Sequence, residues 1–177
     1  MKRKWWMLLV GVIVAVVCGF VAYFFLFGLF EPPVDTSGIN LSSDFTTEGL
    51  LPTQLVGISL NEEKVITYPI VGSRNFVEFN VSRTIATYDG IVLEIMKADN
   101  EDEATLVFEV TFDMEDYFGD ASGFMHKTKA PWWFTYESEG ISGFYWKSGI
   151  WVFGVEAVNG EIRNQAAEEF VLALRGY

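Results

Sequence analysis

Residues 150–175 read IWVFGVEAVNGEIRNQAAEEFVLALR, and they predict a strand followed by a helix. The strand residues alternate, so one set of side chains shares a face. We expect that face to belong to the core, and its members are Trp151, Phe153, Val155 and Ala157. The helix should cover residues 160–175, with Asn159 as its N-cap and Glu161 in its first turn.

An apolar stripe recurs along this helix at helical spacing. It consists of Ile162, Ala166, Phe170, Ala173 and Leu174. A stripe of this kind packs on the core while the other side of the helix faces water. We therefore expect the helix to lie on the face of a sheet that carries Trp151 and Phe153.

A weaker version of this unit occurs earlier in the chain. Residues 90–109 read GIVLEIMKADNEDEATLVFE and compare with residues 149–170, GIWVFGVEAVNGEIRNQAAEEF. Each reads as a strand, an Asn-containing turn and a helix with an acidic start. The comparison predicts an α+β domain with an antiparallel sheet, two helices packed on one face, and a duplicated strand–strand–helix unit.

Residues 101–118 fit two patterns. Alternation as in a strand is shown by Leu106, Phe108, Val110, Phe112 and Met114. A helical stripe is shown by Ala104, Val107, Phe108, Thr111 and Met114. Asn100 followed by Glu103 forms a capping box, and acids in a first turn suit the helix dipole. These start signals favour the helix.

Strands are expected on both sides of this segment. Residues 76–88 alternate, and Asp89-Gly90 is a strong hairpin turn into a strand over residues 91–98. Residues 65–70 look extended, and Pro69 suggests a sheet edge. After residue 120 we expect four further strands, near residues 122–128, 131–137, 141–147 and 150–157.

The segment after residue 120 is rich in aromatic side chains. Adjacent pairs such as Trp132/Trp133 and Tyr145/Trp146 must point to opposite faces of a strand. With both helices on one face, the open face would expose aromatics, which often form a binding surface. This predicts a site for a protein, peptide or glycan, and its residues are Trp132, Trp133, Tyr136, Tyr145 and Trp146. In the alternative, residues 50–70 or a membrane partner cover that face.

Residues 7–30, MLLVGVIVAVVCGFVAYFFLFGLF, contain no charged side chain. As a helix they would span about 36 Å, enough to cross a hydrocarbon core of about 30 Å. Basic residues precede the run and acidic residues follow it, which predicts a cytoplasmic N-terminus and an outward domain. The chain then divides into a basic cytoplasmic tip (1–6), a transmembrane helix (7–30), a linker or stalk (31–49) and an extracytoplasmic domain (50–177).

Two other interpretations of the apolar run are a cleaved signal peptide and a lipoprotein signal. A signal peptide has an apolar core of about 7–15 residues and small residues at the cut, whereas this run ends in bulky ones. Cys18 follows Val17 rather than a small residue, which argues against lipidation. We expect an uncleaved anchor in the cell membrane, with lipid as the partner of residues 7–30.

The charge of the chain limits its partners. The net charge is −12, and three of the 12 basic residues precede the apolar run while none of the 24 acidic residues does. Such an acidic outer domain argues against nucleic acid as a partner. Cys18 is the single cysteine, so no disulfide is expected in the domain. Asn40 and Asn80 begin glycosylation sequons whose use depends on the host.

Catalytic chemistry has little support in the sequence. His126 is the single histidine and lies beside Lys127, so a base for a nucleophile is lacking elsewhere. One histidine, and no cysteine outside the apolar run, argue against zinc. Acidic residues within 99–103 and 113–120 could offer oxygen ligands to calcium but lack the EF-hand spacing. We predict no catalytic residue, no metal and no cofactor.

Three stretches of the outer domain are similar to a known group of proteins. They are Leu51-Pro52 with Gly57-Ile58-Ser59-Leu60, residues 98–108, and residues 149–153, GIWVF. Together they resemble uncharacterised membrane-anchored extracytoplasmic domains of archaea and bacteria. The resemblance covers roughly residues 50–175 and implies the fold and topology, with no catalytic residues.

The expected function is a non-enzymatic, membrane-anchored binding or assembly module that uses the aromatic sheet face. The first alternative is a structural accessory subunit of a membrane complex that docks through its transmembrane helix. Gly11 and Gly19 would allow close helix packing in that case. An enzyme of unknown type is the weakest alternative.

Overall fold

The computed structural model describes residues 11–19, 31–71, 78–118, 122–126 and 132–177; within these, only the backbone is described for 66–71, 78–80, 113–118 and 122–126. The chain divides into two compact units, Met1–Glu31 and Pro32–Tyr177. In the first unit, residues 11–19 are helical and exposed. No helix among the described residues is long and apolar enough to cross a membrane. The rest of the predicted span over 7–30 and the basic tip lie outside the described residues.

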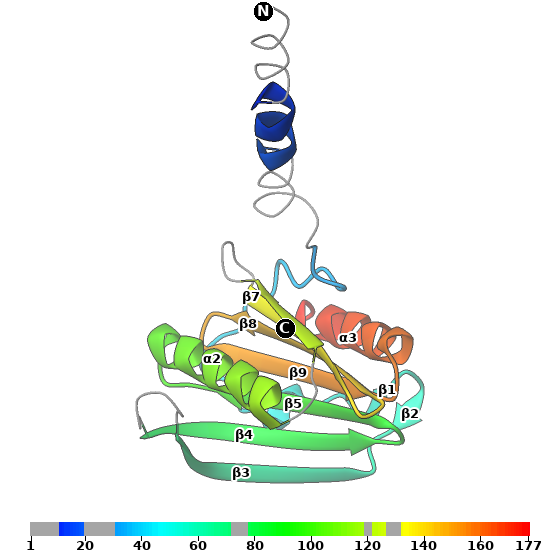
Figure 1. The fold of residues 1–177 in the computed structure, drawn as a ribbon. Coiled ribbons are helices and arrows are strands. Elements are labelled where there is room, and N and C mark those ends of the chain that lie inside the picture. The colour runs from blue at the N-terminus through cyan, green and yellow to red at the C-terminus, as the bar shows by residue number, and fades with distance from the viewer. Residues whose placement is uncertain (1–10, 20–30, 72–77, 119–121, 127–131) are drawn as a thin grey trace, which may run out of the picture. The chain divides into compact units, whose positions relative to one another are not determined.

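The second unit is built on a seven-stranded antiparallel sheet with strand order β3-β4-β5-β9-β8-β7-β6 (Figure 1). Its strands are β3 (Glu62–Val71), β4 (Glu78–Tyr88), β5 (Ile91–Lys97), β6 (Ser122–His126), β7 (Trp132–Ser138), β8 (Ile141–Ser148) and β9 (Trp151–Ala157). β5 and β9 pair in the centre although they are not consecutive, whereas the other ladders of this sheet join consecutive strands. The antiparallel α+β class is confirmed, and β3 lies at an edge as Pro69 predicted.

Tight turns set the hairpins of this sheet. Gly90 adopts a φ of 74° between β4 and β5. Glu139 and Gly140 have φ values of 46° and 81° between β7 and β8. Two successive left-handed residues match the twist of the flanking strands, which explains why this hairpin closes in two residues.

The helix α2 (Glu101–Phe118) confirms the helical interpretation of residues 101–118. Asn100 caps it, because its Oδ1 accepts a hydrogen bond from the Glu103 N–H at 2.9 Å. The Glu103 carboxylate in turn accepts from the Asp99 N–H at 3.3 Å. The buried side chains of α2 join one apolar cluster with the sheet; this cluster includes Ala104, Val107, Phe108, Met96, Phe134, Tyr145 and Val152.

The helix α3 (Gly160–Leu174) begins as predicted, with Asn159 Oδ1 accepting from the Ile162 N–H at 2.9 Å. Its Phe170 ring lies 5.7 Å from the Phe153 ring and 6.2 Å from the Trp146 ring, centroid to centroid. The helix therefore covers the predicted face of β9. The expected stripe is corrected at one position, since Ala173 is exposed and Val171 is buried instead.

The prediction that both helices pack on one face is wrong. Both contact β8 and β9, but from opposite sides. Phe153 contacts α3, whereas its neighbour Val152 belongs to the cluster beneath α2, and neighbouring residues of a strand point to opposite faces. In Figure 1, α2 lies in front of the sheet and α3 on its far side. We call these sides the α2 face and the α3 face.

Residues 34–47, which we call the strap, pack against the rest of the second unit and do not form the predicted stalk over 31–49. Buried side chains occur along the strap, namely Val34, Thr36, Ile39 and Thr47. Lys97 Nζ donates to the strap carbonyl of Phe45 at 2.8 Å, and Thr84 Oγ1 donates to Thr47 Oγ1 at 2.7 Å. The expected domain boundary at residue 50 is therefore corrected, because the compact unit starts at Pro32.

Short elements follow the strap: a 3-10 turn η1 (Glu48–Leu50) and a two-stranded sheet of β1 (Gln54–Leu55) and β2 (Ile58–Ser59). Leu50 and Leu55 are fully buried, so this segment is tucked against the domain as expected. Val56 N–H donates to Glu169 of α3 at 2.8 Å, and Tyr88 donates its hydroxyl to the Pro52 carbonyl at 2.6 Å. These contacts place the segment beside α3.

Candidate functional site

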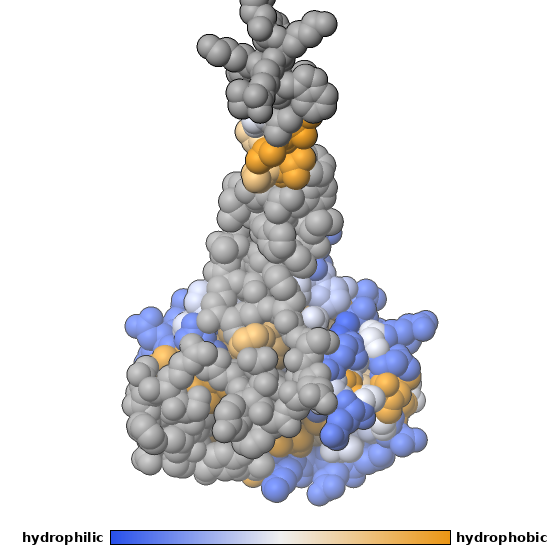
Figure 2. Space-filling model, viewed as in Figure 1, coloured by the Kyte–Doolittle hydropathy of each residue, from blue (hydrophilic) through white to orange (hydrophobic). Residues whose placement is uncertain are grey.

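The five aromatic residues predicted as an exposed binding face are mostly in the core. Trp133 and Tyr136 are each 5 % exposed, Tyr145 is 1 % exposed and Trp146 is fully buried. Trp132 alone of the five is half-buried. Hydrophobic residues that the structure describes form small separate patches on the side seen in Figure 2. The prediction of an open aromatic face is therefore wrong for four of its five residues.

The reason is that each face of β8 has its own helix. Tyr136 and Tyr145 lie in the cluster beneath α2, where the Tyr145 ring stacks on Phe134 at 4.9 Å. Trp146 lies on the α3 face, against Phe170. The expectation that Tyr145 and Trp146 point to opposite faces was correct, but neither face is open.

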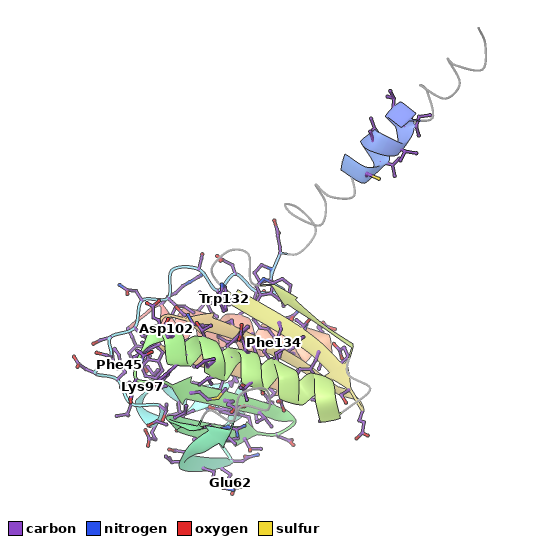
Figure 3. The ribbon with its side chains drawn as sticks, turned by 60° about the vertical axis from the view of Figure 1, so that its left-hand side comes forward. Phe45, Glu62, Lys97, Asp102, Trp132 and Phe134 are labelled. Carbon is purple, nitrogen blue, oxygen red and sulfur yellow. The ribbon has the colours of Figure 1, made fainter. Side chains whose placement is uncertain are left out.

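Trp132 lines a pocket of about 350 Å³ at one end of the sheet. Four segments contribute: the strap, the start of α2, the start of β7, and the end of β8 with its turn. The lining residues are Thr36, Ser37, Gly38, Ile39, Glu101, Trp132, Lys147, Ser148 and Gly149. Figure 3 labels Trp132, Phe134 and Asp102, which lies in the first turn of α2; the Phe134 ring packs on Phe108 of that helix, 5.2 Å between ring centroids.

Strand register and packing on α2 position the indole of Trp132. Trp132 and Lys147 are direct cross-strand neighbours on β7 and β8. Lys147 Nζ lies 5.5 Å from the centre of the indole ring, which is within range of a cation–π interaction. On the helix side, the Phe108 ring lies 6.3 Å from the indole. Trp132 is therefore fixed by the core on one side and borders the pocket on another.

The strap forms the opposing wall and is held by side chains from distant parts of the chain. Ser148 Oγ donates to the Ile39 carbonyl at 3.2 Å. The Arg175 guanidinium donates to the Asp35 and Ser37 carbonyls and pairs with the Asp35 carboxylate at 3.0 Å. The Ser37 hydroxyl, the Ser37 N–H and Arg175 together hold the pKa of Asp35 below its usual value.

Thr36 is the unusual residue of this wall. It is 2 % exposed, and its Oγ1 has no hydrogen-bond partner within the described part of the chain. A buried hydroxyl without a partner costs about 1–3 kcal/mol. Buried polar groups without partners are rare in folded proteins, so Thr36 is the polar group of this wall whose hydrogen-bonding capacity is left unused among the described residues.

Acidic residues at the start of α2 serve the helix. Glu103 completes the cap with Asn100 and Asp99, and Glu101 borders the pocket. Over the described ranges, no group of three or more His, Cys, Asp or Glu side chains is arranged to hold a metal ion. The side chains within 113–120 that the calcium hypothesis also invoked, and the side chain of His126, lie outside those described.

A second polar cluster lies on the α2 face, around the buried side chains of Glu94 and Tyr145. Arg83 of β4 pairs through Nε with Glu94 Oε1 of β5. The Tyr145 hydroxyl lies 3.0 Å from Glu94 Oε2 and 2.6 Å from Glu156 Oε1. Burial raises the pKa of Glu94 against the opposing effect of Arg83. Burial also raises the pKa of Tyr145, and the two carboxylates add to this shift.

One hydrogen on Tyr145 cannot serve both carboxylates. The shorter bond, to Glu156, is therefore its main one, and Glu94 is the longer partner while its other oxygen pairs with Arg83. Two glycines make room for the tyrosine rings: a Cβ on Gly154 would overlap the Tyr145 ring, and one on Gly143 would overlap Tyr136. The cluster is closely packed and links four strands, so it is a structural network.

Most of the pocket could not be predicted from the pattern of residues. The buried residues of the strap are irregularly spaced in the sequence, so the hydrophobic pattern could not predict how the strap packs. Lys147 follows Trp146 in an aromatic strand, and cross-strand pairing with Trp132 depends on register. Glu94 is the residue that pointed to the buried network, because it is the one acid among the apolar residues 91–96.

Comparisons with known proteins do not assign the chain to a family. No family model and no curated protein matches the chain. One solved structure, a GTP binding regulator from Thermotoga maritima, is similar over 66 % of this chain and 74 % of that one. The identity is 19 % and the TM-score is 0.40. At this similarity, neither the fold nor the function of that protein transfers to this chain.

Proposed function

We propose that this chain is a non-enzymatic, membrane-anchored binding module whose ligand site is the pocket at Trp132. One observation carries the proposal: a pocket of about 350 Å³ joins a half-buried indole to polar groups from four separate segments. Small-molecule sites are typically concavities of about 300–1,000 Å³ that combine apolar walls with a few polar groups. The aromatic site of the sequence prediction is thereby reduced to Trp132.

The apolar run supports attachment to a membrane. Residues 7–30 carry no charge and follow a basic tip, so we place the N-terminus in the cytoplasm and residues 32–177 outside. The second unit begins at Pro32, directly after this run, and Val34 is already buried in it.

Binding is favoured over catalysis by the lining of the pocket. None of the lining residues is a histidine or cysteine. Ser148 donates its hydroxyl hydrogen to a backbone carbonyl, which cannot act as a general base. Lys147 interacts with the Trp132 ring, and its ammonium group is therefore engaged in packing the wall.

Tryptophan accessibility tests whether the pocket is open. The outer unit has four tryptophans, of which Trp133, Trp146 and Trp151 are at most 5 % exposed. In the full-length protein in lipid nanodiscs, acrylamide should quench one accessible component, and Trp132→Phe should remove it. Trp5 and Trp6 are replaced by Phe in every sample, so that they do not contribute.

Trp133→Phe is the matched control, because it changes the next residue on the same strand. It should leave the accessible component in place. Equal quenching in the Trp132→Phe protein and its parent would show that the indole is covered, and the proposed pocket would then be discarded.

A further inference from the structure

We propose that the pocket at Trp132 takes a neutral saccharide of one or two rings, with a sugar face against the indole. The proposal rests on the proposed function, since it names the ligand class of that same pocket. Four features of the pocket support the proposal: its size, the chemistry of its lining, the balance of its charges, and a buried hydroxyl without a hydrogen-bond partner among the described residues.

The lining combines the two kinds of surface that a sugar presents. A pyranose ring has C–H groups on its faces, which pack on the electron-rich face of an aromatic ring. Its hydroxyls lie around the rim and both donate and accept hydrogen bonds. Trp132 supplies the aromatic wall, and the rim groups are Thr36, Ser37, Glu101, Lys147 and Ser148. The volume of about 350 Å³ lies at the small end of the range for ligand sites.

The charges at the pocket favour a neutral ligand. Lys147 and Glu101 are one cation and one anion in the same lining, so the site has no net charge from these two. An anionic ligand would also be repelled over a longer distance by Asp102 and Glu103, which follow Glu101 in the first turn of α2 and lie outside the lining. A cationic ligand would be repelled by the ammonium group of Lys147, which belongs to the same lining.

Hydrogen-bond accounting points to a ligand with hydroxyl groups. Thr36 lines the pocket, and its Oγ1 is buried with no partner in the part of the chain that the structure describes. Ser148 Oγ donates to Ile39, which leaves the lone pairs of the hydroxyl for a donor from a ligand. A sugar hydroxyl can donate to one such group and accept from another, which neither a hydrocarbon nor a simple ion can do.

The test uses the full-length protein in lipid nanodiscs free of sugar-based detergents. The soluble probes are cellobiose, maltose and N,N′-diacetylchitobiose, compared with glucuronate, inorganic phosphate and choline. Binding is followed by Trp132 emission and by calorimetry. Insoluble cellulose and chitin form a second arm, which distinguishes a site for free sugars from one for the same sugars within a polymer.

Two substitutions distinguish a ligand role from a structural one. Trp132→Ala should abolish saturable saccharide binding. Thr36→Val keeps the shape of the side chain but removes the hydroxyl, and should weaken binding about tenfold. Because Thr36 Oγ1 has no partner among the described residues, Thr36→Val should leave the melting temperature unchanged or slightly raised. Thr53→Val, an exposed threonine outside the pocket, is the matched control and should leave binding unchanged.

The outcomes separate this inference from the proposed function. Trp132-dependent binding of glucuronate, phosphate or choline, with no binding of neutral sugars, would overturn the ligand class and leave the binding module standing. If no probe binds while acrylamide still quenches Trp132, the saccharide proposal is also wrong. If acrylamide does not quench Trp132, both the saccharide proposal and the proposed binding function are wrong. A clear fall in the melting temperature of Thr36→Val would show a structural hydroxyl and contradict the argument from Thr36.

Discussion

Gly154→Ala should be among the most damaging single substitutions in this protein, although it adds one methyl group. Gly154 lies in β9 under the ring of Tyr145, and a Cβ there would overlap ring carbon Cε1. The ring cannot easily rise, because it stacks on Phe134 and is fully within the α2 cluster. The substitution therefore forces Tyr145 from its place.

The expected cost follows from two terms. Overpacking a closed core costs about 1–3 kcal/mol. Displacing Tyr145 also disturbs its hydrogen bonds to Glu94 and Glu156, and hydrogen bonds to charged groups contribute about 1.5–3 kcal/mol. We expect Gly154→Ala to lower the free energy of unfolding by about 3–5 kcal/mol, a large share of the roughly 5–15 kcal/mol that holds a typical domain folded.

Urea unfolding of the full-length protein measures this cost, and a double-mutant cycle with Tyr145→Ala isolates its cause. Removing the ring makes room, so Gly154→Ala should be nearly neutral in the Tyr145→Ala background. Gly160→Ala is the control, because a Cβ there meets its neighbours at ordinary contact distance, the nearest at 3.5 Å. Equal penalties for Gly154→Ala with and without Tyr145 would refute the steric explanation.

Three further predictions concern the cap, the buried acid and the strap. Asn159→Ala should cost about 1 kcal/mol in urea unfolding, because the Ile162 N–H loses its acceptor. The raised pKa of Glu94 means that the folded state keeps a proton that the unfolded chain releases above about pH 4.5, so stability falls as pH rises through that raised pKa. Glu94→Gln should remove this component from the pH dependence of the unfolding free energy, whereas the exposed control Glu168→Gln should retain it. Arg175→Ala should change global stability by less than about 1 kcal/mol but speed hydrogen exchange at residues 35–39, and unchanged exchange there would show that Arg175 does not hold the strap.

Local features of the fold were predictable because neighbours in sequence determine them. Asn100 and Asn159 cap their helices through an N–H three residues ahead, so each signal is complete within one turn. The Glu139-Gly140 turn likewise depends on two adjacent backbone conformations. The capping box decided residues 101–118 correctly, although the apolar pattern also fitted a strand.

The arrangement of the two helices depended on the register between β5 and β9. α2 packs on the Met96 side of β5, and α3 packs on the Phe153 side of β9. In the observed register Met96 lies opposite Val152, so the two helix-bearing sides face away from each other. A shift of one residue would have placed both helices on the same side. No local pattern in either strand specifies that choice.

The candidate site was predictable only in part, for the same reason. Trp132 was identified from the aromatic content of its strand. The pocket around it needs the strap, whose packing rests on single contacts such as Ser148 with Ile39 and Arg175 with Asp35. These partners lie more than a hundred residues apart in sequence, and polar residues at irregular spacing give no sign of where they dock.

The central pairing of β5 with β9 also has a consequence for synthesis. The chain is made from the N-terminus, so β3, β4, β5 and α2 leave the ribosome before β9 exists. Leu93 and Ile95 point to the α3 face and are fully buried only in the finished molecule. Until β9 arrives, β5 is an unpaired apolar edge, the kind of surface that nascent chains aggregate through. β9 and α3 therefore cover the apolar surface of the first half of the domain. A chain truncated before Trp151 would leave that surface exposed and would aggregate.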